Sequence, residues 1–491
     1  MHRILSSDRQ RCQHLTRRDL LQAGGSALLG LGLGDLATQD AVAALGKGRQ
    51  FGKAKNVILL YLYGAMSQID TLDPKPDGPA EIRGPFQSIA TALPGVRLSE
   101  HLPGIAQRLD RMTVVRSMNH PVPIHNVANA VTGIARTDVS MELNAHDPRH
   151  WPFFGSVLQY LDDEEATRRG QRQPALIPPN VILPWRQSAH APENRAGMYG
   201  GFLGARYDPA VIEFPDKGII GTKTLVEKNP YGGIDRDSKF RFPSTTLPAG
   251  VTLDRFNQRR NLLSRLADAQ HGLANGSPSM GDADSFQKMA LTLCDSTHIP
   301  AALDLDREPA QLRERYGYHL FGQSALMARR LIESGARVAT VFWDEFVQNN
   351  SGWDTHNNQT RRLRDVLCPG LDQTVSALLD DLGDRGMLDE TLVLVLTEHG
   401  RTPKAEGGDG RNHWSSVYSI AMAGAGVARG NVVGASDSQG GIVKDRPVGP
   451  NDILHTIYHL LGVDADRTIP GIQNRPTPLV DGGRVVREIL A

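Results

Sequence analysis

A continuous apolar run in the C-terminal part of the chain limits the possible folds most strongly. Residues 392–396 read Leu-Val-Leu-Val-Leu, with polar residues on both sides. A strand that lacks apolar-polar alternation is buried on both faces, which is typical of a parallel sheet covered by helices. The run therefore predicts an α/β fold with this strand inside the sheet.

Charged and polar residues follow this predicted strand at once. Glu398 and His399 stand at its end, Arg401 comes two residues later, and His413 follows a short loop. In open α/β sheets, ligands bind outside the carboxyl ends of the strands, where the loops converge on a crevice. A carboxylate, two imidazoles and a guanidinium delivered to this edge favour a functional site over simple packing.

The first expected strand of the sheet leads to a second polar loop. Residues 56–63 form an apolar run of strand length, which ends at Gly64. Glycine at this place lets the backbone approach a ligand closely. Asp70 lies in the following loop, either as a metal ligand or as a former of the turn.

A third strand end carries two histidines. Residues 112–116 predict a strand, and residues 127–133 predict a helix that ends at glycine. His120 and His125 lie in the loop between them. They can bind an anion together with the start of the helix, act in acid-base chemistry, or simply be solvated.

A fourth strand end repeats the pattern. Residues 336–343 predict a strand, and a long helix is expected from residue 359 to residue 385. Asp354 and His356 lie between them, two positions apart, so they point to one side if this segment is extended. We favour metal ligands, and the alternative is that Asp354 or Thr355 caps the helix.

Together these side chains suit a divalent metal ion. The expected ligands are Asp70, Asp354, His356, Glu398, His399 and His413. Mixed carboxylate and imidazole ligands favour Zn²⁺ or a similar ion, in one or two copies, over Ca²⁺, Mg²⁺ or Mn²⁺. Two ions would clamp the attacking and leaving oxygens of a phosphoryl or sulfuryl transfer, and Arg401 and Arg411 can hold the remaining oxygens.

The overall composition gives no sign of a nucleic-acid partner. The 491 residues include 54 basic and 54 acidic side chains, so the formal net charge is zero. No basic cluster stands out, as a nucleic-acid-binding surface would require. The sequence indicates nothing about the oligomeric state.

The N-terminus predicts export. Residues 16–21 read Thr-Arg-Arg-Asp-Leu-Leu, a twin-arginine pattern, and residues 41–43 form a small-residue cleavage site. The apolar part between them is too short and too rich in glycine for a membrane anchor. We therefore expect a signal peptide over residues 1–43 and a periplasmic or extracellular protein. The mature domain then spans residues 44–491, with a loop-rich and helical insertion at about residues 150–310.

Several of these motifs resemble the alkaline phosphatase and sulfatase superfamily. They are the apolar first strand, Thr132-Gly133, Asp354 with His356, Thr397-Glu398-His399-Gly400, and His413. The pairing of Gly-Arg-Thr-Pro with Gly-Arg-Asn-His-Trp resembles more closely a twin-arginine-exported branch, domain of unknown function 1501. The resemblance implies a doubly wound, mostly parallel sheet flanked by helices, with a two-metal site that hydrolyses phosphate or sulfate esters. It also implies that Glu398 and His399, Asp354 and His356, and His413 are metal ligands.

The chain departs from the superfamily pattern at two places. Tyr63 and Gly64 stand where the first strand would end in a ligand aspartate, and Pro123 and His125 stand where the nucleophile is expected. We therefore expect an exported metal-dependent ester hydrolase that uses water activated by the ion, with His125 or His120 as the acid-base partner. The alternative is a sulfatase-like protein that binds an anionic glycan without turnover. The expected partner is thus an anionic small molecule or glycan.

Overall fold

The computed structural model describes residues 50–134, 143–171, 175–187, 195–214, 237, 239–242, 298–343, 352–406 and 409–491. The chain divides into a unit Met1–Phe51, of which only the last two residues are described, and a unit Gly52–Ala491. The expected signal peptide and the helices expected at residues 253–271 and 284–294 lie outside the described residues. Within the described residues, none of the helices is both long enough and apolar enough to cross a membrane.

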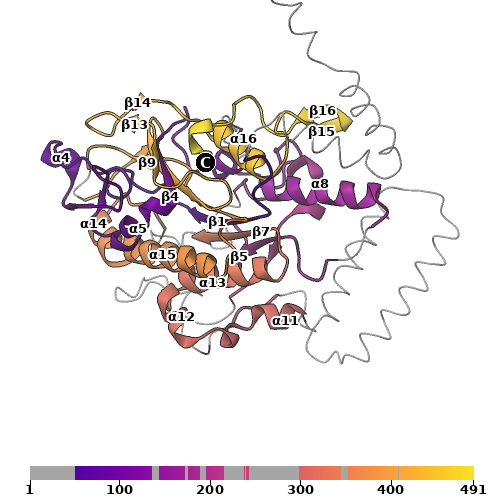
Figure 1. The fold of residues 1–491 in the computed structure, drawn as a ribbon. Helices are drawn as coiled ribbons and strands as arrows, with labels where there is room; N and C mark the ends of the chain where they lie inside the picture. Colours follow the sequence, from indigo (N-terminus) through magenta and orange to yellow (C-terminus); the bar gives the residue numbers. More distant parts are fainter. Residues whose placement is uncertain are drawn as a thin grey trace, which may run out of the picture. The chain divides into compact units, whose positions relative to one another are not determined.

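An eight-stranded sheet forms the centre of the second unit, in the order β12-β4-β11-β8-β1-β7-β5-β6 (Figure 1). Its strands are β1 (Asn56–Leu62), β4 (Met112–Met118), β5 (Asn180–Leu183), β6 (Ala210–Val211), β7 (Val338–Trp343), β8 (Thr391–Leu396), β11 (Tyr418–Ala423) and β12 (Asn431–Val433). β1 pairs in parallel with β7 and β8, whereas β11 is antiparallel to β4 and β8. β1 thus lies inside the sheet, and the sheet is mostly parallel.

Helices cover both faces of this sheet, because alternate residues of each strand point to opposite sides. In β1, Ile58 and Leu60 pack into one core with α5 (Pro103–Gln107), α13 (Leu320–Glu333) and α15 (Cys368–Asp384). Val57 and Leu59 pack into the other core with α6 (Val127–Thr132), α8 (Phe154–Arg168) and α16 (Pro450–Leu460). Figure 1 shows α13 and α15 on one side of the sheet and α8 and α16 on the other. The expected doubly wound α/β fold is confirmed.

The remaining described elements are short. The helices are α4 (Ala80–Arg83), α11 (His298–Leu303), α12 (Ala310–Tyr316) and α14 (Gln359–Arg362). The strand pairs outside the sheet are β2 (Ser88–Ala90) with β3 (Arg97–Ser99), β9 (Gly400–Arg401) with β10 (His413–Trp414), β13 (Ala435–Ser436) with β14 (Val443–Asp445), and β15 (Thr468–Pro470) with β16 (Pro476–Pro478). A π-helical segment, Leu363–Leu367, joins α14 to α15, so the long helix expected after the fourth strand is present with a π turn inside it.

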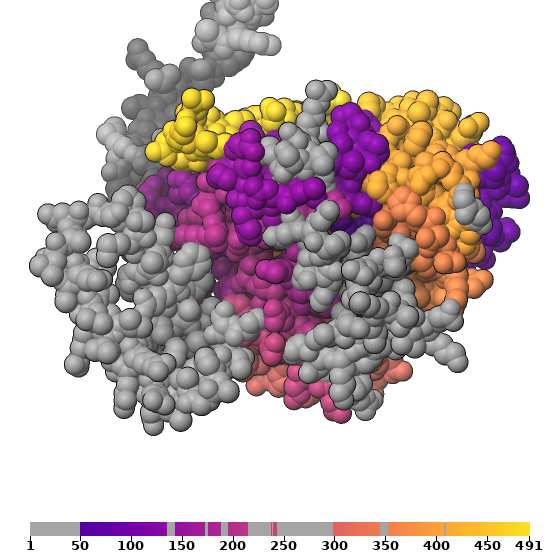
Figure 2. All heavy atoms as spheres, turned by 180° about the vertical axis from the view of Figure 1, so that it is seen from behind, coloured from indigo at the N-terminus to yellow at the C-terminus, as the bar shows by residue number. Residues whose placement is uncertain are grey.

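The part of residues 150–310 that the structure describes contributes to the main sheet. β5 pairs in parallel with β7, and β6 pairs in parallel with β5. β6 has only two residues and no apolar run of its own, so the sequence gives no signal for it. Residues of this stretch also meet the end of the chain, since the Trp151 indole N–H donates to the Pro478 carbonyl at 3.2 Å. In Figure 2 the purple and magenta atoms accordingly lie against the yellow C-terminal ones.

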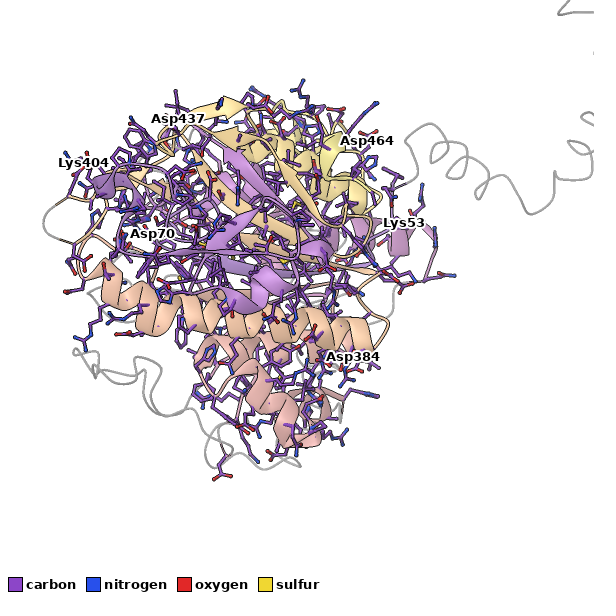
Figure 3. All side chains as sticks on the ribbon, turned by 60° about the vertical axis from the view of Figure 1, so that its left-hand side comes forward. Lys53, Asp70, Asp384, Lys404, Asp437 and Asp464 are labelled. Atoms are coloured by element: carbon purple, nitrogen blue, oxygen red, sulfur yellow. The ribbon has the colours of Figure 1, made fainter. Side chains whose placement is uncertain are left out.

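The loops at the carboxyl ends of the parallel strands lie together at one end of the sheet. Figure 3 shows Asp70, which follows β1, at the same end as Lys404, which follows β8. Lys53, just before β1, and Asp384, at the end of α15, lie at the opposite end. The edge predicted to hold the site is therefore the one where polar loops from distant parts of the chain meet.

Candidate metal centre

Four side chains from three loops converge at this edge. The potential ligand atoms of His125, Asp354, His356 and His413 all lie within 4.8 Å of one another. His125 precedes α6, and Asp354 and His356 precede α14. His413 lies on β10, where pairing with β9 places it opposite Arg401. The structure thus brings together His125 with three of the six predicted ligands.

Two glycines allow these loops to approach each other. A Cβ at Gly64 would lie 2.2 Å from the backbone nitrogen of Asp354, and Gly64 has φ +105°. A Cβ at Gly410 would lie 1.8 Å from the carbonyl oxygen of His356. Any side chain at either position would push the Asp354–His356 segment away, so the glycines permit the site to form.

The distances within the cluster match those between the ligands of one ion. Asp354 Oδ1 lies 3.0 Å from His356 Nε2, 3.3 Å from His125 Nε2 and 3.5 Å from His413 Nε2. Ligands about 2.0–2.1 Å from a tetrahedral Zn²⁺ are separated by about 3.3–3.4 Å. The oxygen and the three nitrogens therefore have the spacing of a single coordination sphere.

The tautomers of His356 and His413 leave two nitrogen lone pairs facing each other. Their Nε2 atoms are 3.0 Å apart. The Nδ1–H of His413 donates to the Pro123 carbonyl at 3.1 Å, and that of His356 donates to Asn412 Oδ1 at 2.8 Å. The amide of Asn412 is oriented by Glu406, whose carboxylate can only accept from Asn412 Nδ2. Two lone pairs at this distance repel each other unless a proton on one of the rings or a metal ion lies between them.

Glu398 orients the ring of His125, as Asn412 orients the ring of His356. The Nδ1–H of His125 donates to Glu398 Oε1 at 2.8 Å, which leaves the Nε2 lone pair directed toward Asp354. Glu398 Oε1 also accepts the Gly64 N–H at 2.7 Å, and the Glu398 side chain is fully buried. A carboxylate that holds the far nitrogen of a ligating histidine is common around metal ions. The sequence predicted Glu398 as a metal ligand and His125 as an acid-base group. We propose instead that His125 is the ligand and that Glu398 orients it.

His399 lies deeper in the same cluster. Its Nδ1–H donates to the Gly400 carbonyl at 2.8 Å, and its Nε2 has no hydrogen-bond partner among the described residues. The ligand atoms of His399, Glu398 and His125 form a second group within 4.8 Å of one another. Burial and the nearby charges of His125, Arg401 and His413 hold the pKa of His399 well below its usual value. His399 is therefore a neutral imidazole behind the first group.

The charges within the cluster shift the acidity of its members. Burial disfavours a charged His125, but the carboxylates of Asp354 and Glu398 outweigh this effect and raise the pKa of His125 to about 9. Burial also opposes the ionised form of Asp354, yet His125, His413 and Arg401 hold the pKa of Asp354 far below its usual value. For His413, burial is the largest influence and lowers the pKa. The two carboxylates thus stabilise positive charge within the cluster.

Arg401 holds the cluster from within the protein. Its side chain is fully buried, and its guanidinium donates to Asp354 Oδ1 and to the Gly64 carbonyl. The Nε–H donates to the Ala65 carbonyl at 3.1 Å, and Nη1 donates to the Arg411 carbonyl at 3.2 Å. In place of the predicted contact with substrate oxygens, these bonds make Arg401 a positioning residue for Asp354.

Asp70 is not part of the cluster. Its carboxylate is buried in an ion pair with Arg411, with Nε to Oδ2 at 2.8 Å, and it also accepts from Ser67 at 2.5 Å and from Gln359 at 2.9 Å. In place of the predicted metal contact, Asp70 neutralises Arg411, so Arg411 is also engaged within the protein. The reason is the loop after Gly64, which carries Asp70 away from the strand end.

His120, predicted as an acid-base residue, also lies outside the cluster. Its Nε2–H donates to the Glu398 carbonyl at 2.7 Å, and its Nδ1 accepts the Val122 N–H at 3.4 Å. Burial lowers the pKa of His120. The ring therefore supports the backbone that carries Glu398, and the sequence could not distinguish this contact from a catalytic role.

Sequence reasoning missed Asn412 and Glu406, which orient His356. Asn412 stands directly before His413, and this proximity was the one signal available.

A cavity of about 550 Å³ along α8 shares no residue with the cluster, and its charged lining includes the ion pairs Arg206–Asp163 and Arg467–Glu164. The chemistry of the ligand set, rather than the size of a cavity, identifies the candidate site.

The chain belongs to the family described as "Protein of unknown function (DUF1501)", whose model matches residues 54–490. None of the curated proteins matches it. Among solved structures, it is similar to an alkaline phosphatase superfamily protein from Vibrio parahaemolyticus, with 11% identity, a TM-score of 0.37, and coverage of 90% of this chain and 71% of the other. It is also similar to a sulfatase from Pseudoalteromonas sp., with 12% identity, a TM-score of 0.37, and coverage of 87% and 70%. A phosphonate monoester hydrolase from Silicibacter pomeroyi shows 13% identity, a TM-score of 0.34, and coverage of 89% and 76%.

Proposed function

We propose that this protein is a metal-dependent hydrolase of phosphate or sulfate esters. The observation that carries the proposal is the pair of Nε2 atoms of His356 and His413, which face each other at 3.0 Å with both Nδ1–H groups engaged elsewhere. Together with His125 and Asp354 they form a set of three nitrogens and one carboxylate oxygen, which suits Zn²⁺ or a similar first-row ion. When bound, such an ion would polarise a phosphoryl or sulfuryl oxygen and make water more acidic.

The exposed and buried residues of the cluster have different roles. The side chain of His356 is 38% exposed and that of His413 is 26% exposed, whereas Glu398 is fully buried. A substrate therefore approaches from the side of His356 and His413. Glu398 and Arg401 lie behind the ligands, where they keep His125 and Asp354 in place and exclude water from that side.

The hydroxyl that adjoins Glu398 in the sequence is engaged in other contacts. Thr397, next to Glu398, is buried; its hydroxyl donates to the Leu62 carbonyl at 2.9 Å and accepts the Met66 N–H at 3.1 Å. These bonds hold Thr397 at the junction of β8 and the loop after β1. The proposal therefore uses water rather than Thr397 as the nucleophile.

The test combines metal analysis with an activity screen. The mature chain should copurify with, or take up, a divalent ion and should cleave some members of a panel of aryl phosphate and sulfate esters. His413→Ala should lose both the ion and the turnover. His455 lies on α16 and its ring donates to the Gly482 carbonyl, so His455→Ala should keep both. Ion binding without turnover on the whole panel would favour the alternative, a protein that binds an anionic glycan.

We also propose export by the twin-arginine route, which rests on the sequence of the N-terminus alone. Replacing Arg17 and Arg18 by lysine should leave the precursor inside the cell, whereas the unchanged chain should reach the periplasm or the medium and lose about its first 43 residues. Fractionation and N-terminal sequencing measure both outcomes. Secretion of the double variant at the normal level would contradict this route.

A further inference from the structure

We propose that this centre holds one metal ion, and that the guanidinium of Arg401 takes the part that a second cation would play. The inference rests on the proposed metal site, and it departs from the two-metal site that the superfamily resemblance implies. Three features of the chain support it: the contacts of Arg401, the contacts of Glu398, and the charge of the site.

The first feature is the end of β1. The resemblance places a ligand carboxylate directly after this strand, but Tyr63 and Gly64 stand there. The structure shows backbone carbonyls at this place instead, and the Arg401 guanidinium donates to those of Gly64 and Ala65. The same guanidinium donates to Asp354 Oδ1, the oxygen that lies among the three Nε2 atoms. A permanent positive charge is thus built in on the protein side of Asp354.

The second feature is Glu398, the central member of the deeper group. Its Oε1 already accepts the Gly64 N–H at 2.7 Å and the His125 Nδ1–H at 2.8 Å. An ion between Glu398 and His125 would have to displace the proton on Nδ1 while Nε2 faces the first ion. The imidazole would then be a negatively charged imidazolate. A histidine that binds one ion through Nε2 keeps its Nδ1 proton and stays neutral. Glu398 therefore serves to orient His125, which leaves His399 Nε2 as the unengaged nitrogen of the deeper group, and one nitrogen alone does not make a second metal site.

The third feature is the charge of the buried side. Asp354 and Glu398 are the two carboxylates of the cluster, and Arg401 already pairs with one of them. Glu398 then contributes the one negative charge that has no such partner, and a single divalent ion already exceeds it. A second divalent ion would add uncompensated charge next to the fully buried guanidinium, and burying unpaired charge is costly.

The test is the ion stoichiometry of the unchanged mature chain. The metal-free protein is titrated with Zn²⁺, and separately with Co²⁺, and the bound ions are counted by native mass spectrometry and by elemental analysis after dialysis. We expect saturation at one ion per chain, whatever the catalytic activity. Saturation at two ions would overturn the inference and leave the proposed hydrolase intact. If neither ion binds, both the inference and the proposed metal site are wrong.

Two variants assign the roles. Glu398→Gln should still bind one ion, because the amide oxygen can accept the His125 N–H; loss of one of two ions would show that Glu398 is a ligand. Arg401→Lys should bind one ion at least about tenfold more weakly, because an ammonium cannot reach Asp354 and the carbonyls of β1 with the same geometry. Arg329→Lys is the matched control, since Arg329 is equally buried but pairs with Glu308 and Asp381. Equal ion affinity in the two lysine variants would overturn the role of Arg401.

Discussion

At the scale of single residues, hydrogen bonds to the outer nitrogens of the histidines decide what the inner nitrogens can do. His125, His356, His399 and His413 each donate their Nδ1–H to an oxygen. Each Nε2 is therefore a lone pair in the neutral ring. This shared arrangement, more than the number of histidines, distinguishes the cluster from a group of solvated side chains.

Asn412 provides the sharpest residue-scale prediction. Asn412→Leu removes the acceptor of the His356 Nδ1–H, so we expect ion affinity to fall about 10–100-fold, the usual effect of losing such an outer contact. Asn412 is exposed, so the melting temperature of the metal-free protein should barely change. The double variant Asn412→Asp with Glu406→Gln exchanges carboxylate and amide, and should retain most of the affinity. Isothermal titration with Zn²⁺ measures all three proteins, and an unchanged Asn412→Leu would contradict this role.

The pKa of His125 predicts how pH acts on the metal-free protein. The pKa is raised from 6.5 to about 9 in the folded chain, so the folded state binds the proton more tightly than the unfolded state. This contribution to stability is complete below about pH 6.5 and is lost as the pH rises through about 9. Thermal melts of metal-free protein from pH 6 to pH 10 should show the decline, and His125→Gln should reduce it.

The same proton competes with the ion. Because His125 must be neutral to use its Nε2, binding of Zn²⁺ should release a proton and should strengthen as the pH rises toward about 9. Titrations in buffers of different ionisation enthalpy count the released protons. Affinity that is independent of pH between 6 and 9 would argue that His125 is not a ligand.

At the scale of secondary-structure elements, the site depends on how closely the loop after β7 can approach the end of β1. Gly64 lies at that contact, with φ +105°, and a Cβ there would lie 2.2 Å from the Asp354 nitrogen. The Gly64 N–H and carbonyl also bind Glu398 and Arg401. The glycine thus joins the two elements through its backbone, which no side chain could do without moving one of them.

Gly64→Ala tests this contact against a matched control. Gly335 has a similar φ of +109°, but a Cβ there would meet nothing within 4 Å. Both alanine variants should lose about 1–2 kcal/mol from the strained backbone conformation. Only Gly64→Ala should also lose ion affinity, because Asp354 must shift. The comparison needs chemical denaturation and a Zn²⁺ titration, and equal ion binding in the two variants would contradict the argument.

At the scale of the whole molecule, the buried pair of Asp70 and Arg411 ties together segments that are far apart in sequence. Asp70 follows β1, Arg411 precedes β10, and Gln359, which also donates to Asp70, starts α14. The backbone N–H of Arg411 donates to the Thr355 carbonyl at 3.1 Å, next to His356. This network holds the three loops of the site in one arrangement without touching the proposed ion.

Asp70→Asn measures the strength of that network. It leaves the Arg411 charge buried without its partner, so we expect a loss of about 3–5 kcal/mol in unfolding free energy. Adding Arg411→Met should recover part of the loss, because the unpaired charge is gone. Ion stoichiometry should stay the same in Asp70→Asn wherever the variant is folded. Loss of the ion at a temperature where the fold persists would return Asp70 to the ligand set.

The sequence by itself determined the α/β fold and the edge of the sheet that carries the polar loops. Apolar runs such as that of β8, and the glycines and charged residues that end them, are local patterns with a direct physical meaning. The same patterns predicted Asp354, His356 and His413 as ligands, because each lies in a loop at a strand end or on the segment that returns from it.

Only the tertiary structure decided which polar groups meet at that edge. Gly64 bonds to Glu398 across 334 positions, and Arg401 bonds to the same glycine across 337. Such contacts depend on how the loops close in space, and a strand-end position does not specify them. For this reason the sequence could not separate Asp354, which lies among the histidines, from Asp70, which neutralises Arg411, or from Glu398, which orients His125. The strand ends place charged groups in one region, and the packing of the loops assigns each of them its partner.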